Sequence, residues 1–288
     1  MSPTSPCDAA DDGGSQRPAT VVGERLGIVD YTNVAPLHWG LEPWPGARFY
    51  RGVPTDLNAR LLAGDLDLTL ISSVEFVRHR ERLVALPDFS IATLGPVHSV
   101  MLFHHRPWRE LAGARIAVST ESATSVALLE VLLRADGIAA QLVPAASDLA
   151  AMLAGHDAAL LIGDAALEEA VVRRAVGGRV PYVTDLGEAW YRLTRLPFTF
   201  AVWAADAERP PSPRLVAALR EARTRGLGHL ADVAQVEAEA RGLAPEVVLR
   251  YLANFRYFLM PPDRDGLEAF ACRIDTNFRP GELRYWDL

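Results

Sequence analysis

The amino-acid sequence predicts a two-lobed α/β fold with two mixed sheets, flanking helices and a helical C-terminal stretch. From Arg25 onward, short apolar runs alternate with amphipathic stretches, which is typical of strands joined by crossover helices. Two longer apolar runs, residues 97–105 and 198–204, are interpreted as crossings between the two lobes. After residue 211, four helical patterns follow one another with no strand between them.

The first lobe is predicted to begin with three strands, each followed by a helix. We expect the strands at residues 26–31, 47–51 and 66–71, and the helices at residues 34–40, 53–63 and 73–79. Asn33 is a candidate N-cap for the first helix, Pro54 stands near the start of the second, and Ser72 or Ser73 is a candidate cap for the third. The strand–helix–strand order predicts parallel pairing of these strands.

The second lobe is predicted to repeat this alternation before the C-terminal helices. We expect its strands at residues 115–118, 139–143, 158–162 and 181–184, and its helices at residues 122–135, 147–154, 164–172 and 188–193. The four C-terminal helices are expected at residues 211–228, 233–240, 245–258 and 266–278. We therefore assign residues 21–105 and 200–288 to lobe 1 and residues 106–199 to lobe 2, after a disordered leader at residues 1–20. A cleft between such lobes is the expected small-ligand site.

The composition excludes several classes of protein. All 29 Lys+Arg residues of the 288-residue chain are arginines, which excludes a Schiff-base lysine, a pyridoxal-phosphate anchor and a P-loop lysine. The net charge of −7 argues against a nucleic-acid partner. Cys7, Cys272 and the histidines show no metal-ligand spacing, so we expect neither a metal nor a cofactor. The leader lacks a signal-peptide pattern and no window approaches the ~18 apolar residues of a membrane span, so we expect a cytoplasmic protein with no membrane partner.

Polar side chains stand where predicted strands end and helices begin. Asn33 closes the first strand, where doubly wound sheets place ligand contacts, although Asn is also a common cap or turn residue. Hydroxyls of Ser72 and Ser73, and of Ser122, Thr124 and Ser125 around Ala123, stand at helix starts that suit an anion, although capping alone also places them there. His98 and Ser99 lie in a turn before the first crossing, and Gly163 and Asp164 follow a strand of lobe 2, where Asp164 either caps the next helix or faces a ligand. These residues predict a cleft for a small anion, without a conventional catalytic constellation.

Six segments in this order resemble the chorismate dehydratases of the futalosine route to menaquinone. They are LGIVDYTNVAPLHW (26–39), DLDLTLISSVEF (65–76), GPVHSVML (95–102), STESATSVAL (119–128), LIGDAAL (161–167) and DLGEAWYRLTRLPFTFAVW (185–203). The resemblance implies the two-lobed fold of type II periplasmic binding proteins. It also implies conversion of chorismate to 3-(1-carboxyvinyloxy)benzoate with loss of water, and chorismate as the small-molecule partner.

The resemblance also implies roles for individual residues. By position, Asn33 and Ser99 are expected to be catalytic and to contact the reacting part of chorismate. The residues expected to bind substrate are Ser72, Ser73, His98, Ser122, Ala123, Thr124, Ser125, Gly163 and Asp164. His98 falls at a variable position of the GPVxS segment. Because the matched cleft residues are neutral, our hypothesis is that the enolpyruvyl carboxylate of the substrate removes the ring proton, with a side-chain base as the alternative.

Two other functions stay open on the sequence. The related 1,4-dihydroxy-6-naphthoate synthase of the same pathway shares the fold and is expected to offer a catalytic histidine in the cleft. A non-catalytic protein that binds a small anion is the second alternative, because a fold does not determine a function. The C-terminal helices are expected to expose an apolar patch that could support a homodimer.

Overall fold

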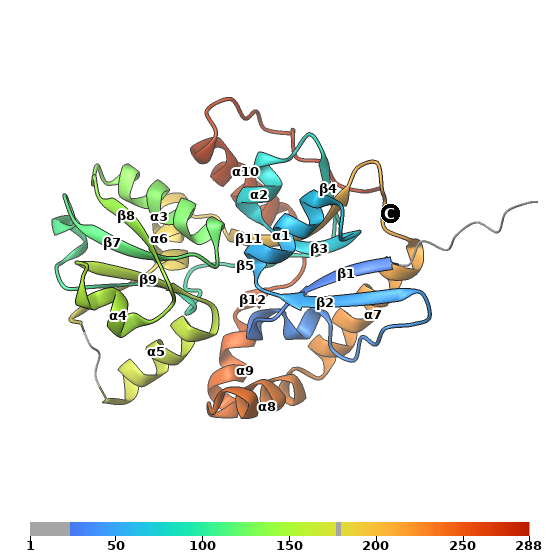
Figure 1. Ribbon diagram of the computed structural model, residues 1–288, viewed down its shortest axis with the longest axis horizontal. Helices are drawn as coiled ribbons and strands as arrows, with labels where there is room; N and C mark the ends of the chain where they lie inside the picture. Colours follow the sequence, from blue (N-terminus) through green and yellow to red (C-terminus); the bar gives the residue numbers. More distant parts are fainter. Residues whose placement is uncertain (1–23, 177–179, 288) are drawn as a thin grey trace, which may run out of the picture.

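Two separate mixed β-sheets organise the molecule (Figure 1). The computed structural model describes residues 24–176 and 180–287, so the predicted leader at residues 1–20 lies outside the described residues. Each sheet contains both parallel and antiparallel strand pairs, with helices flanking it. The predicted α/β class is therefore confirmed.

The first sheet has seven strands in the order β12-β5-β11-β3-β1-β2, and β4 also pairs with β11. Its strands are β1 (Glu24–Val29), β2 (Ala47–Gly52), β3 (Leu68–Ser72), β4 (Leu83–Ala85), β5 (Ile91–Thr93), β11 (Phe198–Asp206) and β12 (Phe255–Arg256). The connecting helices are η1 (Thr32–Leu37), α1 (Pro54–Ala63) and α2 (Ser73–Arg78). β1 pairs in parallel with β2 and β3, as the strand–helix–strand order predicts.

The second sheet has five strands in the order β10-β6-β9-β7-β8. They are β6 (Val100–His104), β7 (Arg115–Ser119), β8 (Gln141–Ala145), β9 (Ala158–Ile162) and β10 (Tyr182–Asp185). The helices of this half are η2 (Trp108–Glu110), α3 (Ala123–Ala135), α4 (Leu149–Ala154), α5 (Gly163–Val176) and α6 (Leu186–Thr194). β7 runs parallel to β8 and β9, whereas β6 runs antiparallel to β9.

Four helices end the described chain and pack on the half that holds the first sheet (Figure 1). They are α7 (Pro213–Gly228), α8 (Leu230–Arg241), α9 (Pro245–Ala253) and α10 (Pro261–Ile274). Three of them begin with proline, which has no N–H to leave unpaired in a first helical turn. No helix in the described residues is long and apolar enough to span a bilayer.

Our expectation of four helices with no strand between them is wrong. The two-residue strand β12 lies between α9 and α10 and pairs with β5. A segment this short carries no periodic pattern, so only its partner strand defines it as a strand. The three-residue strands β4 and β5 escape sequence analysis for the same reason.

Asn33 is not the N-cap of the first helix, contrary to our prediction. The segment folds as the short 3-10 helix η1, its N-cap is Tyr31, and Asn33 is its second residue. Pro36 lies inside η1 and has no N–H for an α-helical hydrogen bond, which favours a short 3-10 turn over a regular α-helix. Asn33 therefore does not cap this helix, and helix capping was one alternative to a ligand contact.

The first crossing between the proposed lobes lies earlier in the chain than the sequence predicts. β6 pairs in the second sheet with β9 and β10, so residues 100–104 do not belong with the first sheet. β11 pairs with β3, β4 and β5, so the return crossing precedes residue 198. We keep the division into two lobes as a proposal, with its first boundary before β6 rather than at residue 105.

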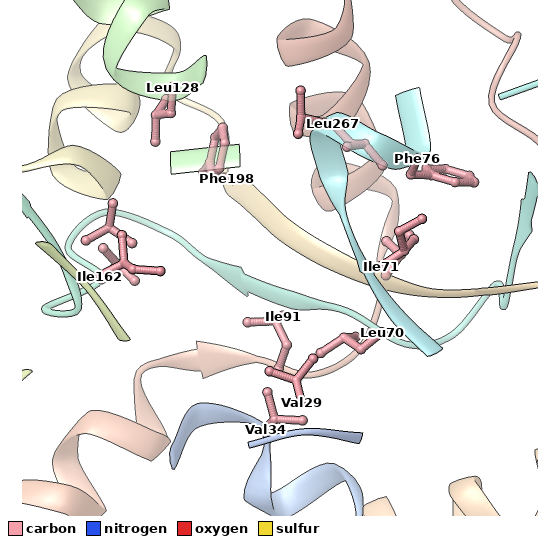
Figure 2. Packing of buried hydrophobic residues seen from close by; sticks show 14 of the residues in the cluster. Val29, Val34, Leu70, Ile71, Phe76, Ile91, Leu128, Ile162, Phe198 and Leu267 are labelled. Carbon is pink, nitrogen blue, oxygen red and sulfur yellow. The ribbon is translucent and has the colours of Figure 1, made fainter. Parts of the chain in front are cut away.

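The buried apolar side chains form one large cluster that spans both sheets and a smaller cluster within the second half. β6 shows how one strand serves both: Val100 and Leu102 belong to the large cluster, whereas Met101 and Phe103 belong to the small one. Successive side chains of a strand point to opposite faces, so both faces of β6 are covered and its first four residues, 100–103, are apolar. The large cluster extends to the ends of the strands where the two halves meet (Figure 2).

Candidate active site

A cavity lies between the two sheets and is lined by residues of both. Val29, Ser72 and Ile162 line it from the carboxyl ends of the parallel strands β1, β3 and β9. Figure 2 shows Val29 and Leu70 on one side and Ile162 on the other. Ligands of open α/β sheets bind at such strand ends, so the cavity is the candidate active site.

The wall of this cavity is apolar, with a few neutral polar groups. The polar residues that line it are Tyr31, Asn33, Ser72, Ser99, Ser122 and Ser125. None of the described residues that line the cavity is a carboxylate, a histidine or an arginine. The described residues also contain no group of three His, Cys, Asp or Glu side chains that could hold a metal ion. The wall therefore offers hydrogen bonds but no ordinary general base.

Asn33 brings a primary amide to the cavity wall from η1. Its side-chain oxygen is buried and has no hydrogen-bond partner among the described residues. A buried polar atom without a partner costs about 1–3 kcal/mol, so native proteins rarely keep one without a reason. An unpaired amide oxygen on a cavity wall indicates a ligand that completes its hydrogen bonding.

Ser99 enters the cavity wall from the turn that precedes β6, and its side chain is almost fully buried. The hydroxyl of Tyr251 in α9 donates a hydrogen bond to Ser99 Oγ at 2.8 Å. The backbone N–H of Gly163 donates to the Ser99 carbonyl oxygen at 2.8 Å, which ties the turn to the start of α5. Ser99 is therefore held through both its side chain and its backbone.

His98 lies beside Ser99 but is not part of the cavity wall. Its φ of 64° is left-handed, and its backbone N–H donates to Oδ2 of Asp185, the N-cap of α6, at 2.8 Å. The Val97 N–H donates to the same carboxylate at 3.0 Å. Burial raises the pKa of Asp185, whereas these backbone hydrogen bonds oppose the rise. The Asp185 carboxylate thus fixes the backbone of the turn that presents Ser99.

Ser72 and Gly163 also reach the cavity, as the sequence predicts for binding residues. The Asn58 side-chain amide donates to Ser72 Oγ at 3.0 Å and orients that hydroxyl. Gly163 has a φ of 61°, and a Cβ atom added there would lie 3.0 Å from the ring of Tyr31. Only glycine combines this backbone conformation with this close approach.

Three long helices begin at the cavity: α1 at Pro54, α3 at its N-cap Ser122, and α5 at Gly163. The first N–H groups of a helix have no partners within it and carry partial positive charge. Ser122 Oγ accepts a hydrogen bond from the Ser125 N–H at 3.2 Å, and the two hydroxyls are 3.0 Å apart. The first turn of α3 contains no acidic residue, whereas those of α1 and α5 contain Asp56 and Asp164, which offset part of the positive potential there.

Besides His98 and Asp164, three residues predicted to bind substrate lie outside the cavity wall: Ser73, Ala123 and Thr124. The Ser73 hydroxyl donates to the Thr199 carbonyl oxygen at 2.6 Å and ties α2 to β11. Thr124 Oγ1 accepts a hydrogen bond from the Val74 N–H at 3.0 Å and joins α3 to α2. Ala123 lines a separate surface hollow. These hydroxyls link secondary-structure elements, and their predicted contact with substrate stays untested.

Comparison with known proteins identifies the family. Residues 24–275 match the family model described as menaquinone biosynthesis. The chorismate dehydratase of Thermus thermophilus is 44% identical over 265 residues, which cover 88% of this chain and 96% of that protein. The chain belongs to the menaquinone biosynthesis family. The family resemblance inferred from the six sequence segments is therefore confirmed.

Solved structures show how the fold of this family member relates to others. A protein from Archaeoglobus fulgidus superposes with a TM-score of 0.68 at 17% identity, over 86% of this chain and 95% of that chain. The periplasmic aliphatic sulphonate binding protein SsuA from Escherichia coli superposes with a TM-score of 0.57 at 18% identity, over 87% of this chain and 85% of that chain. The predicted periplasmic-binding-protein-like fold is confirmed, and at these identities the likeness concerns the fold alone.

This member of the menaquinone biosynthesis family has cavity residues that sequence analysis did not name. Tyr31 and Phe200 line the cavity, and Tyr251 contacts Ser99 from behind the wall. Tyr31 stands two positions before Asn33 in a segment already singled out, so it could have been named. Phe200 lies in a predicted crossing strand, where apolar residues are expected on either face. Tyr251 carries no local signal, because its partner is 152 residues away in the chain.

Polar contacts beside the cavity join the two halves of the molecule, and we call them the interlobe latch. The Tyr31 hydroxyl donates to Glu121 Oε2 at 3.0 Å, and the Thr32 N–H donates to Asp164 Oδ1 at 3.2 Å. Arg241 of α8 binds the other oxygen of Asp164 at 2.6 Å. Burial and the nearby Glu121 raise the pKa of Tyr31 above its ordinary value, so it stays a neutral donor.

Asp164 therefore has a role that sequence analysis did not consider. Its carboxylate accepts hydrogen bonds from η1 and α8 rather than standing in the cavity wall. Tyr31 and Thr32 precede Asn33 directly, and both are bound to the second half of the molecule. These contacts between the two halves thus hold the segment that carries Asn33 in place.

We expect Arg241→Gln to raise the KM for the substrate about tenfold while changing kcat less, which corresponds to about 1.4 kcal/mol of lost binding. The reason is that the variant leaves the Asp164 carboxylate, 19% exposed, without its cationic partner, as well as Glu237 on α8, and so weakens the contacts between the two halves. Steady-state kinetics measure this. Arg192→Gln is the matched control, because Arg192 pairs with Glu188 within the exposed surface of α6. An equal rise of KM in both variants would contradict the latch.

Proposed function

We propose that this protein is a hydro-lyase that removes water from chorismate and forms 3-(1-carboxyvinyloxy)benzoate on the route to menaquinone. The observation that carries the proposal is a cavity between the two halves with a neutral amide, several hydroxyls and no ordinary base on its described wall. Its sequence similarity to the chorismate dehydratase of T. thermophilus extends over nearly the whole of that protein. Both fit a reaction whose base belongs to the substrate.

The chemistry of chorismate explains why such a site suffices. Loss of the ring hydroxyl and of the proton on the neighbouring ring carbon makes the ring aromatic, so the reaction is strongly downhill. The protein needs to hold one reactive conformation, keep water out and disfavour the competing rearrangements of chorismate. Fixed neutral dipoles on an apolar wall serve these needs better than a strong acid or base.

In the proposed mechanism, the enolpyruvyl carboxylate removes the proton from the ring carbon that bears the ether. The bond between the adjacent ring carbon and its hydroxyl breaks, and the departing hydroxyl takes up that proton and leaves as water. The Asn33 side-chain NH2 group donates a hydrogen bond that orients the carboxylate, and the Ser99 hydroxyl donates a hydrogen bond to the departing oxygen. Both side chains keep their own protons, so neither has to be regenerated.

Helix starts hold the two carboxylates of the substrate in this proposal. The first turns of α1 and α3 border the cavity from the two halves of the molecule. Each helix end contributes about 0.3–1 kcal/mol toward a carboxylate, rising to ~2 kcal/mol when the site is partly buried. The hydroxyls of Ser72, Ser122 and Ser125 add donors beside these ends.

The naphthoate synthase of the same pathway is the second candidate function. That enzyme is expected to offer a histidine to its substrate. The described wall of this cavity contains no histidine, and His98 lies outside the wall. This composition favours the dehydratase.

The test is incubation of the purified protein with chorismate, followed by chromatography with mass detection. We expect an aromatic acid one water lighter than chorismate, formed faster than in a sample without protein. Chorismate loss equal to that of the protein-free sample would reject the proposal. Thermal stabilisation by chorismate without turnover would instead indicate a binding protein, because a ligand that binds only the native state stabilises it.

The cytoplasmic location and the homodimer stay predictions. The C-terminal stretch exposes Phe258 and Met260, with 44% and 51% of their surfaces accessible. Both lie between β12 and α10 rather than within a helix, so the apolar patch expected on the C-terminal helices stays a prediction.

A further inference from the structure

Tyr251 is a buried tyrosine that the mechanism above leaves without a role. Its side chain is 2% exposed, and its ring packs edge-on against Phe255 with the ring centres 5.1 Å apart. Its hydroxyl lies behind the cavity wall and donates a hydrogen bond to Ser99 Oγ at 2.8 Å. The tyrosine therefore contacts the proposed catalytic hydroxyl and not the cavity itself.

This contact decides how the Ser99 hydroxyl is used. Ser99 Oγ accepts a hydrogen bond from the Tyr251 hydroxyl, so the proton of Ser99 itself has to point elsewhere. Its other hydrogen-bond partner in the structure is the Val97 carbonyl oxygen at 3.5 Å, which is at the limit of a hydrogen bond. The Ser99 proton is thus available to an acceptor in the cavity. A hydroxyl that accepts one hydrogen bond also donates a stronger one, because the two bonds polarise each other.

The end of α9 holds the turn around Ser99 at a second point. The Asn254 side-chain amide donates to the Pro96 carbonyl oxygen at 2.6 Å, three residues after Tyr251 in the chain. Burial raises the pKa of Tyr251 above its ordinary value, and the nearby Asp164 adds to this, so its hydroxyl stays protonated as a donor. α9 thereby presents a permanent donor to a turn that it also braces.

We propose that Tyr251 is a positioning residue for catalysis: its hydrogen bond aims the Ser99 proton at the departing hydroxyl of the substrate. This inference rests on the proposed dehydration of chorismate and assigns the orientation of Ser99 in that reaction. Tyr251 transfers no proton, because burial and the nearby Asp164 keep its pKa above the ordinary value although Arg241 and the Ser99 hydrogen bond oppose the rise. Its contribution is the direction and strength of the hydrogen bond that Ser99 donates.

The test compares Tyr251→Phe with Tyr257→Phe. Tyr257 is also buried and also stands near Phe255, but its hydroxyl has no hydrogen-bond partner among the described residues. We expect Tyr251→Phe to lower kcat about tenfold with KM changed less than about twofold, the size of effect seen when a supporting hydrogen bond to a functional group is lost. Tyr257→Phe should keep the kcat of the unaltered protein. Unchanged kcat in Tyr251→Phe, or an equal loss in both variants, would overturn the inference.

A double-mutant cycle with Ser99→Ala separates positioning from a structural role. In the Ser99→Ala background, Tyr251→Phe should lower kcat no further, because there is no hydroxyl left to aim. If the fold-losses of kcat in the two single variants multiply in the double variant, the inference is overturned and Tyr251 has a structural role. The double variant should also have a higher Tm than Ser99→Ala alone, because it no longer buries an unpaired Tyr251 hydroxyl.

The two proposals fail in different ways. If the unaltered protein does not convert chorismate, the proposed function is wrong, and the catalytic role of Tyr251 falls with it. If the unaltered protein converts chorismate and Tyr251→Phe does so equally fast, only the inference about Tyr251 is wrong.

Discussion

Replacement of Asn33 by alanine is expected to lower kcat on chorismate on the order of 100- to 1,000-fold, the loss typical of removing one well-placed donor to a reacting oxygen. The amide lines the cavity, and in the proposed mechanism its NH2 group is the donor to the substrate carboxylate. Steady-state kinetics with mass detection of the product measure the effect. Near-full turnover by Asn33→Ala would reject the catalytic assignment.

The stability of the ligand-free Asn33→Ala variant tests the same assignment independently. An unpaired buried oxygen costs free energy in the folded state, so its removal should leave the free energy of unfolding equal or slightly higher. If Asn33 served stability instead, its replacement by alanine would lower the free energy of unfolding. Asn33→Asp should be as inactive as the alanine variant although it has the same shape, because an aspartate repels the substrate carboxylates and donates no hydrogen bond.

Replacement of Ser99 by alanine is also expected to lower kcat on the order of 100- to 1,000-fold, because it removes the donor to the departing hydroxyl. Here the stability should fall as well, by about 1–3 kcal/mol, because the buried Tyr251 hydroxyl loses its acceptor. Kinetics and urea unfolding measure the two effects. Turnover by Ser99→Ala within a few-fold of the unaltered protein would reject its catalytic role.

The two variants are thus predicted to differ in stability although they share a loss of activity. Asn33 has no side-chain partner among the described residues, whereas Ser99 is held by Tyr251. The difference follows from one asymmetry of hydrogen bonds: removal of a lone buried group is tolerated, while removal of one partner of a buried pair strands the other. Equal losses of stability in the two variants would contradict this picture of the site.

Much of the fold was predictable from local patterns. The alternation of apolar and amphipathic stretches predicted β1, β2, β3 and their connecting helices within a few residues of their observed bounds. Short elements without a period escaped, and β12 is a strand only because β5 lies beside it. The 3-10 form of η1 followed from Pro36, a residue visible in the sequence whose effect we did not weigh.

The candidate site was predictable only in part. Asn33, Ser72, Ser99, Ser122, Ser125 and Gly163 were named from the sequence and do line the cavity. Ser73 and Thr124 had the same sequence signal, a hydroxyl at a helix start, and yet their hydroxyls bond to Thr199 and Val74. A hydroxyl at a helix start satisfies the same local rule whether it faces a ligand or a neighbouring element, so the rule cannot separate the two cases.

The sequence by itself determined the α/β class, the family, and the neutral amide and hydroxyls available for an anion. Only the tertiary structure decided which of these groups share the cavity, that Tyr251 donates to Ser99, and that Arg241 and Asp164 join the two halves. The physical reason is the range of the forces involved. Helix starts, turns and apolar periods depend on residues a few positions apart, whereas these contacts join residues 77 and 152 positions apart and form only when the packed sheets bring them together.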